Sequence, residues 1–309
     1  MTTKKEKEPP IGIVVESHGS FYKVQWGDSL IQAVLRGKFR KEKQRTTNPV
    51  VVGDYVELRM EKGQGVIQKI LPRKNELARP SSGGKKVHVI AANLDQALIV
   101  TSPKEPKVSF GLVDRILVAC QAFEIPPVIW VNKTDLASPE ELEEYQQVYH
   151  LTGFPLYFGS ARTKDGLEDL KQVLSNKVTL FVGPSGVGKS TLLNALEPGL
   201  HLRTGEVSSS THKGKHTTTY TSLLRLSFGG YVVDSPGMRE FELPPIPKEE
   251  LAYYFPEMVE MLGQCKFNNC QHLSEPGCAM HKWLEEKKIH PKRYKSYCNM
   301  LESLENIEN

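Results

Sequence analysis

Residues 179–196, TLFVGPSGVGKSTLLNAL, contain the pattern that decides the fold. The short run 179–182 is predicted to be a strand, and residues 189–196 are predicted to be the helix that follows it. Between them, residues 183–190 match the phosphate-loop pattern GxxxxGK[ST] in full. In this strand–loop–helix context, the loop N–H groups and the helix N-terminus face phosphates, which argues against a chance glycine-rich turn.

Two side chains of this loop are candidates for direct roles in nucleotide chemistry. Lys189 is expected to reach the β- and γ-phosphates, and the Ser190 hydroxyl is expected to bind Mg²⁺. Gly183 and Gly188 permit the tight backbone path. The candidate phosphate-binding residues are Gly183, Pro184, Ser185, Gly186, Val187, Gly188, Lys189, Ser190 and Thr191.

The motif Asn132-Lys133-Thr134-Asp135 follows a second short apolar run, at 128–131, and matches the guanine-recognition pattern NKxD. Asp135 can accept hydrogen bonds from N1–H and the 2-amino group of guanine. Adenine has neither donor and would leave a buried carboxylate unpaired, at a cost of about 1–3 kcal/mol. Asn132 can bond the other purine edge and brace the loop, and the Lys133 stem can lie over the ring. These four residues therefore favour GTP over ATP.

The order of the motifs is circularly permuted. Ser160-Ala161, whose Ala161 N–H can donate to guanine O6, follows NKTD, and both precede the phosphate loop. A conventional Ras-like GTPase has the phosphate loop first. The rearrangement places Asp234-Ser235-Pro236-Gly237, a DxxG motif, at the C-terminal edge of the domain. Whatever follows it is attached to the part that is expected to move.

The DxxG motif and the segment before it form the expected switch. Asp234 is expected to hold Mg²⁺ through water, and the Gly237 N–H to meet the γ-phosphate. Residues 211–219, THKGKHTTT, supply the threonines of a nucleotide-dependent segment, and Thr218 is our candidate ligand within the triplet 217–219. An ordinary polar loop or strand start is the alternative interpretation.

The catalytic group is less evident. Ras-like enzymes place a water-orienting glutamine after DxxG, whereas this chain has Met238, so hydrolysis must be slow or must use another group. His216 is the best local candidate, because an imidazole can orient or deprotonate water near neutral pH. A surface histidine that contacts solvent or RNA is the alternative. The catalytic candidates are His216, Lys189 and Gly237.

The N-terminal part is predicted to be a small β-barrel. Five short strands with glycine-bearing turns between residues 11 and 73 suggest an OB-fold. The run 36–45, RGKFRKEKQR, has six basic residues against one acid, which favours a phosphate backbone as its partner; a solvated loop is the alternative. Residues 80–86 are interpreted as a flexible linker.

The C-terminal part is predicted to be a small helical metal domain. Cys265, Cys270, His272 and Cys278 form C-x4-C-x-H-x5-C, a donor set suited to one tetrahedral structural Zn²⁺ per chain. Unliganded buried cysteines are the alternative. His281 and Cys298 are competing ligands, and Cys120 is expected to pack in a core helix.

Bulk properties limit the remaining possibilities. The 309 residues carry a net charge of +4, which would not by itself indicate nucleic acid. No segment approaches the about 20 apolar residues of a membrane helix, and no secretory signal is present. Cysteines without an export signal favour a metal site over disulfides. We expect a cytoplasmic monomer with no membrane partner.

The fold class that we predict is multidomain α/β. Residues 1–75 are expected to form an OB-fold RNA-binding domain with a disordered leader. Residues 76–247 are expected to form a circularly permuted P-loop GTPase domain with a doubly wound parallel sheet, because strands and helices alternate there. Residues 248–309 are expected to form the α-helical zinc-binding domain.

These motifs together resemble the RsgA family (also called YjeQ or YloQ), circularly permuted GTPases that depend on the small ribosomal subunit. The most specific elements are NKTD, GPSGVGKST, GKHTTT, DSPGMREF and the Cys/His cluster, in that order. The resemblance covers nearly the whole chain. It implies slow GTP hydrolysis stimulated by the small subunit, a role in late subunit maturation, binding to its rRNA, and His216 as the proposed catalytic group. It also implies the zinc ligands Cys265, Cys270, His272 and Cys278.

Two other functions remain open at this point. The missing glutamine makes a GTP-gated RNA-binding scaffold without significant turnover credible. A P-loop kinase or ATPase for a small metabolite is a third class, which NKTD argues against. Other assembly factors are further possible partners of a ribosome-assembly GTPase.

Overall fold

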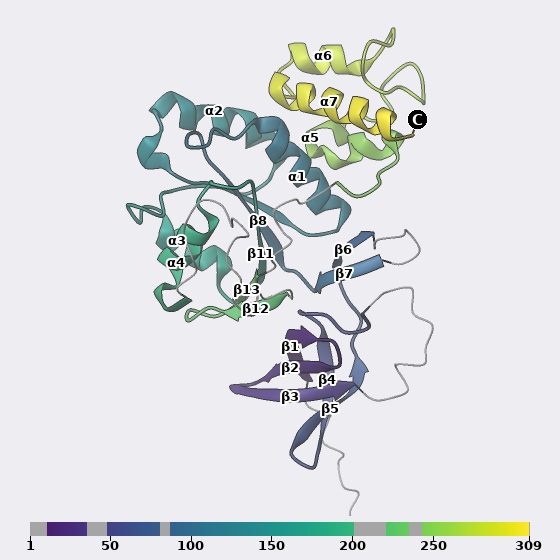
Figure 1. Cartoon of the computed structure of the whole chain (residues 1–309). Helices are drawn as coiled ribbons and strands as arrows, with labels where there is room; N and C mark the ends of the chain where they lie inside the picture. The colour runs from purple at the N-terminus through teal and green to yellow at the C-terminus, as the bar shows by residue number, and fades with distance from the viewer. Residues whose placement is uncertain (1–10, 36–47, 81–86, 201–220, 235–242, 309) are drawn as a thin grey trace, which may run out of the picture. The chain divides into compact units, whose positions relative to one another are not determined.

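The computed structural model describes residues 11–35, 48–80, 87–200, 221–234 and 243–308 (Figure 1). The expectations for the basic run 36–45 and for most of the linker 80–86 therefore lie outside the described residues. Contacts group the chain into two compact units. The first contains Met1–Asp95, Asn176–Leu180 and His212–Gly237, and the second contains Gln96–Ser175, Phe181–Thr211 and Met238–Asn309.

The first unit contains the expected five-stranded barrel. The strands pair in the order β1-β2-β3-β5-β4, and β4 pairs back onto β1. Alternate residues such as Val24, Val56 and Ile67 point into its core and are fully buried. The strands are β1 (Ile11–His18), β2 (Phe21–Trp26), β3 (Ser29–Leu35), β4 (Tyr55–Glu61) and β5 (Gln64–Ile70).

A separate hairpin follows the barrel. β6 (Glu76–Pro80) pairs antiparallel with β7 (Val87–Ala92), a strand that the sequence pattern suggested would begin the α/β region. The hairpin instead lies against the barrel. A Cβ on Gly53 would lie 2.0 Å from the Ala92 carbonyl oxygen, and the buried Asn93 amide donates to the Gly53 carbonyl at 2.9 Å. Ala91 and Ala92, at the end of β7, are fully buried at these contacts.

The strand that carries Asp234 is part of a mixed arrangement. β13 (Tyr231–Asp234) runs parallel to β11 (Val178–Val182), with Leu180 opposite Val233. β12 (Ser222–Arg225) is antiparallel to β13, which differs from the all-parallel expectation. The cause is the short connection between them, where Gly229 and Gly230 have φ of +91° and +92°, so that the chain reverses directly.

In the second unit, three parallel strands position the base-recognition motifs. β9 lies between β8 and β10, and every residue of β8 and β9 is buried, as expected for a parallel sheet. The strands are β8 (Gln96–Thr101), β9 (Pro127–Val131) and β10 (Leu156–Phe158). The helices are α1 (Phe110–Ala122), α2 (Pro139–Tyr149), α3 (Leu167–Leu174) and α4 (Lys189–Leu196), and the short 3₁₀ turns are Thr134–Leu136, His150–Thr152 and Pro198–Leu200.

Local signals explain where α2 starts. Ser138 accepts a hydrogen bond from the Glu141 N–H, and the Glu141 side chain accepts one from the Ser138 N–H, which completes a capping box. Pro139 occupies the first turn, where its missing N–H costs nothing. The helix therefore begins a few residues after NKTD.

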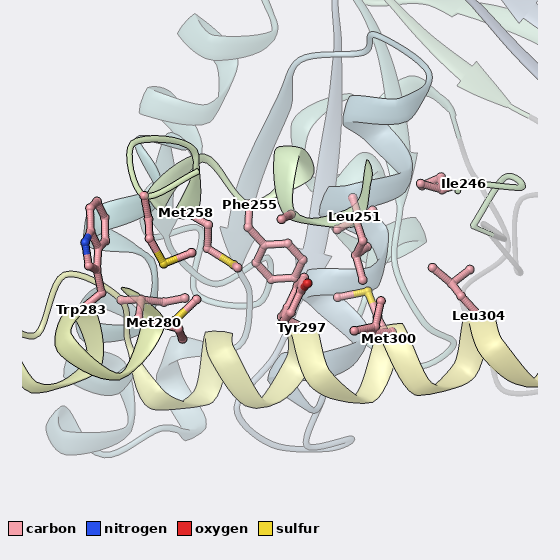
Figure 2. Close-up of a cluster of buried hydrophobic side chains, with 14 of the residues drawn as sticks. Ile246, Leu251, Phe255, Met258, Met280, Trp283, Tyr297, Met300 and Leu304 are labelled. Atoms are coloured by element: carbon pink, nitrogen blue, oxygen red, sulfur yellow. The ribbon is translucent and has the colours of Figure 1, made fainter. Parts of the chain in front are cut away.

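The C-terminal helices share their core with α1. Figure 2 shows Tyr297, Met300 and Leu304 on one face of α7 (Pro291–Glu308), directed at Leu251 and Phe255. Val118 of α1 belongs to the same buried cluster. The other elements here are a 3₁₀ helix (Lys248–Tyr254), α5 (Pro256–Val259) and α6 (Ala279–Glu285). Figure 1 shows α5 and α7 beside α1, with α6 beyond α7.

A buried ion triad joins α1, α5 and α7. The Arg293 guanidinium donates to Asp114 at 2.6 Å and to both oxygens of Glu257, at 2.6 and 3.1 Å. The three side chains are at most 2% exposed, so the charges depend on one another rather than on water. None of the helices within the described ranges is long and apolar enough to cross a membrane.

Candidate functional site

The phosphate loop leaves β11 along a path that only glycine can follow. Gly183 has φ +140°, and a Cβ there would lie 2.2 Å from the Val100 carbonyl oxygen. Gly188, at φ +95°, is as restricted, because a Cβ would lie 2.6 Å from the Asn132 side-chain nitrogen. The two glycines thus allow the loop to approach β8 and NKTD and to enter α4 with its N–H groups unblocked.

Lys189 curls back over the loop. Its Nζ donates to the carbonyl oxygens of Gly183 and Pro184, at 2.6 and 2.7 Å. Ser190 and Thr191, the next residues of α4, are exposed. The Lys189 ammonium group can bind the phosphates of a nucleoside triphosphate. The exposed Ser190 and Thr191 hydroxyls, at the start of α4, can serve as ligands for Mg²⁺.

Asn132 connects the three predicted nucleotide-binding segments. Its side chain, 1% exposed, donates to the Val187 carbonyl of the phosphate loop at 2.8 Å and accepts from the Ala161 N–H at 3.2 Å. Its own N–H donates to the Thr101 carbonyl at 2.8 Å. The Asn132 side-chain amide therefore holds NKTD to the Ala161 turn, 29 residues away in sequence, and to the phosphate loop at Val187, 55 residues away.

The other NKTD residues are less buried than Asn132. Lys133, in the left-handed region at φ +61°, donates from Nζ to the Gly186 carbonyl of the phosphate loop at 2.9 Å. Asp135 is exposed, so its carboxylate is accessible to a ligand, and Thr134 begins a 3₁₀ turn. A carboxylate at this rim can accept the two donors of a guanine edge.

The Ser160-Ala161 motif forms a closed turn. Ser160 Oγ, nearly fully buried, accepts from the N–H groups of Arg162 and Thr163, both at 3.2 Å. The Ala161 N–H, which we interpreted as a donor to guanine O6, donates to Asn132 in this structure. Binding of a base at this point would require the N–H to share or exchange that partner.

One contributor to this site was not foreseen from the sequence. Residues 102–108, between β8 and α1, contact Lys133 through the Glu105 carbonyl, and Pro106 lies beside Gly186 of the phosphate loop. The only signal in the sequence was a pair of prolines after a buried strand.

Several candidates are not placed by the structure. His216, Thr218, Gly237 and Met238 lie outside the described residues. Asp234 ends β13, one residue beyond the pair formed by Leu180 and Val233, but its side chain is not described. Their roles remain predictions.

The Cys/His cluster is assembled as predicted. Within the described part of the chain, the donor atoms of Cys265, Cys270, His272 and Cys278 all lie within 4.8 Å of one another, which fits a single metal ion. Neither His281, which is exposed, nor Cys298 belongs to this group. Cys120 is fully buried in α1, as expected of a packing residue.

The surroundings of the cluster favour a cation. Burial raises the pKa of the Cys278 thiol to about 12, so a thiolate there requires a positive neighbour. Burial lowers the pKa of His272, which keeps its imidazole neutral and able to ligate. Backbone N–H groups of Ala279 and Met280 point at the Cys265 and Cys278 sulfurs, at 3.3 and 3.4 Å.

The loop that holds His272 is fixed from α7. The Tyr294 hydroxyl donates to the His272 and Leu273 carbonyls at 2.8 and 3.1 Å, and the Tyr297 hydroxyl donates to the Gln271 carbonyl at 2.8 Å. These bonds position the ligand backbone before any metal binds.

Comparison with known proteins agrees with this geometry. A family model described as RsgA GTPase matches residues 70–244, and one described as RsgA N-terminal domain matches residues 11–67. The chain belongs to the RsgA GTPase family. The resemblance inferred from the motif order is thereby confirmed.

Relatives of similar length extend the match over nearly the whole chain. The small ribosomal subunit biogenesis GTPase RsgA of Bacteroides fragilis is 40% identical over 300 residues, covering 95% of this chain and 97% of the relative. The protein of the same name from Caldanaerobacter subterraneus subsp. tengcongensis is 40% identical over 299 residues, covering 96% of both chains.

Two solved structures share the fold. The crystal structure of YjeQ from Thermotoga maritima matches with a TM-score of 0.81 and 37% identity, over 96% of this chain and 98% of the other. YloQ, described as a circularly permuted GTPase, matches with a TM-score of 0.78 and 32% identity, over 99% and 98%. The permuted α/β fold predicted from the motif order is confirmed.

Proposed function

We propose that this GTPase hydrolyses GTP slowly to GDP and phosphate, that the small ribosomal subunit stimulates this turnover, and that it acts in late maturation of that subunit while binding its rRNA. The observation that supports this most strongly is Asn132, which ties NKTD, the phosphate loop and Ala161 into one site. Relatives named small ribosomal subunit biogenesis GTPase support the choice of partner.

The nucleotide is proposed to lie across the two motifs held by Asn132. Asp135 recognises guanine, the Lys133 stem covers the base, and the loop N–H groups with Lys189 bind the phosphates. Ser190 and Asp234 are the residues that we expect to hold Mg²⁺, which would supply positive charge for the phosphates. Family membership implies GTP and Mg²⁺, and the assignment of these residues is our proposal.

The Cys/His cluster is proposed to hold one structural Zn²⁺. Three sulfurs and one imidazole within 4.8 Å complete a tetrahedral shell, with no open position for a reacting water. The ion would stabilise the loop between α5 and α6.

His216 is proposed to orient the attacking water, since Met238 cannot. The His216→Ala variant should bind GTP like the unaltered chain and lose most subunit-stimulated turnover, by about 10²–10⁴-fold as is typical for a general acid or base. Unchanged turnover would assign the histidine to solvent or RNA instead.

Multiple-turnover GTP hydrolysis tests the proposed function. We expect the rate to rise strongly with purified small subunits and barely with large subunits, and Lys189→Ala to abolish the response because it weakens nucleotide binding. A GTP-gated scaffold predicts subunit binding without hydrolysis, which a separate single-turnover assay on the subunit distinguishes. Equal stimulation by both subunits, or by neither, would contradict the proposal.

A further inference from the structure

The connection between β8 and α1 is a closed loop with its own internal bonds. Ser102, fully buried, donates from Oγ to the Pro106 carbonyl at 2.7 Å. The Val108 N–H donates back to the Ser102 carbonyl at 3.0 Å. The backbone of residues 102–108, which we call the clamp segment, is therefore fixed from within, although its tip is exposed.

The tip of the clamp segment reaches the guanine-recognition motif. The Glu105 carbonyl accepts a hydrogen bond from Lys133 Nζ, and the same ammonium group donates to the Gly186 carbonyl at 2.9 Å. Pro106 closes the other side, since a Cβ on Gly186 would lie 3.2 Å from its ring. Lys133 is thus held between the clamp segment and the phosphate loop.

A second anchor fixes the outer side of the segment. Lys104 forms an ion pair of 3.1 Å with Glu141, whose other role is to cap α2. The clamp segment is therefore anchored at the start of α2 as well as at Lys133. Ser109, the first residue after the clamp segment, is the N-cap of α1. Its side chain accepts a hydrogen bond from the Leu112 N–H at 3.3 Å.

The physical consequence concerns conformational entropy. A free lysine side chain has several rotatable bonds and loses about 2 kcal/mol of rotamer entropy when it is fully ordered. With two of its three N–H donors already bonded, Lys133 has lost much of that freedom before a ligand arrives. Preorganisation of this kind increases affinity without adding a contact to the ligand.

We propose that the clamp segment is a positioning element of the nucleotide site, which holds Lys133 in place as a platform for the purine ring and thereby raises the affinity for guanine nucleotides. This inference rests on the proposed nucleotide site. It adds to that site a segment outside the recognised motifs that acts only through Lys133.

Binding of GDP to the full-length chain, measured by isothermal titration, tests the proposal. Ser102→Ala removes the bond that closes the clamp segment, and we expect affinity to fall about 3- to 10-fold, the loss that one hydrogen bond accounts for. Ser109→Ala is the matched control, since it removes a helix cap outside the segment, and it should stay within about twofold of the unaltered chain. Melting curves verify that both variants fold.

A double-mutant cycle separates positioning from a general structural effect. In a Lys133→Met background, Ser102→Ala should cause no further loss, because the group that it positions is gone. An unaltered affinity of Ser102→Ala, or the same loss in both backgrounds, would overturn the proposal while leaving the proposed function intact. Failure of the unaltered chain to bind GDP would instead overturn the proposed function, and this proposal with it.

Discussion

Asn132 and Asp135 have different roles within one four-residue motif. Asn132 is 1% exposed and bonded on both sides of its amide to other segments of the site, so its role is to hold the site together. Asp135 is exposed at the rim, where its carboxylate is accessible, and we propose that it meets the ligand. The same motif therefore contains one residue for stability and one for specificity.

Asp135→Asn should change the preferred base. An asparagine keeps one acceptor but presents an N–H₂ group to the guanine 2-amino group, whereas xanthine has a carbonyl there that can accept. We expect the affinity for GDP to fall by about 100-fold or more and the affinity for xanthosine diphosphate (XDP) to rise. Competition titrations with the two nucleotides measure both effects.

Glu140→Gln is the control for charge, because it removes an exposed carboxylate a few residues away at the start of α2. It should leave both affinities within about twofold. If Asp135→Asn bound GDP as tightly as the unaltered chain, Asp135 would not be the base-recognition residue.

The residues of the site were predictable where local pattern and chemistry coincide. Asp135 and Lys189 follow short apolar runs that form β9 and β11, and a parallel sheet brings such strand ends together. The Glu105 contact was not predictable, because it uses a backbone carbonyl, which leaves no trace in residue identity.

At the scale of elements, the Arg293 triad fixes α7 to α1 and α5. The two neighbouring carboxylates keep this arginine fully charged, because they raise its pKa, although burial alone would lower it. Removing one partner of a buried ion group is costly, because the others then remain charged without compensation.

Arg293→Met should therefore lower the free energy of unfolding by about 3–5 kcal/mol. Arg115→Met, at the same interface between α1 and α7, is the matched control. Among the residues that the structure describes, Arg115 donates to the neutral Ser303 hydroxyl at 2.9 Å and to no carboxylate, so the loss should be about 1 kcal/mol. Urea denaturation measures both. Equal losses would show that the triad contributes no more than a single neutral hydrogen bond.

The four residues of the Cys/His cluster should differ from Cys298 in their effect on zinc binding. Cys270→Ser should lose the bound zinc, and its melting temperature should fall. Cys298→Ser, which changes a half-buried cysteine outside the group, should keep one zinc per chain. Metal quantification on the purified chains decides between the two sets of ligands. Loss of zinc from the Cys298→Ser variant would show that Cys298 is a zinc ligand, contrary to this prediction.

Element boundaries followed from the sequence, whereas long-range pairings did not. The helix at 189–196 and the strand at 128–131 were located to within a residue, because a glycine precedes the helix and an apolar run marks the strand. Asp114, Glu257 and Arg293 are far apart and show no shared pattern, so no periodicity could have paired them. The antiparallel β12 was hidden for a similar reason: its direction depends on a turn.

For the whole molecule, the permutation changes what can be coupled to the nucleotide. The chain continues from β13 through the DxxG motif into the helices that hold the metal cluster. The C-terminal segment is also attached to α1 through the triad and the shared core of Figure 2. A conformational change at the nucleotide site can therefore reach the C-terminal helices in two ways. One is along the chain that follows the DxxG motif, and the other is through the packing of α7 against α1.

The proposed function couples the nucleotide site to the small subunit, and we expect the bound guanine nucleotide to set the affinity for that subunit. Co-sedimentation of the full-length chain with purified small subunits tests this coupling most directly. With a non-hydrolysable GTP analogue, we expect binding at least about fivefold tighter than with GDP, the lower end of ordinary coupling between sites. An ATP analogue should have no effect, and Lys189→Ala should remove the difference. Equal binding with the GTP analogue and with GDP would contradict the account.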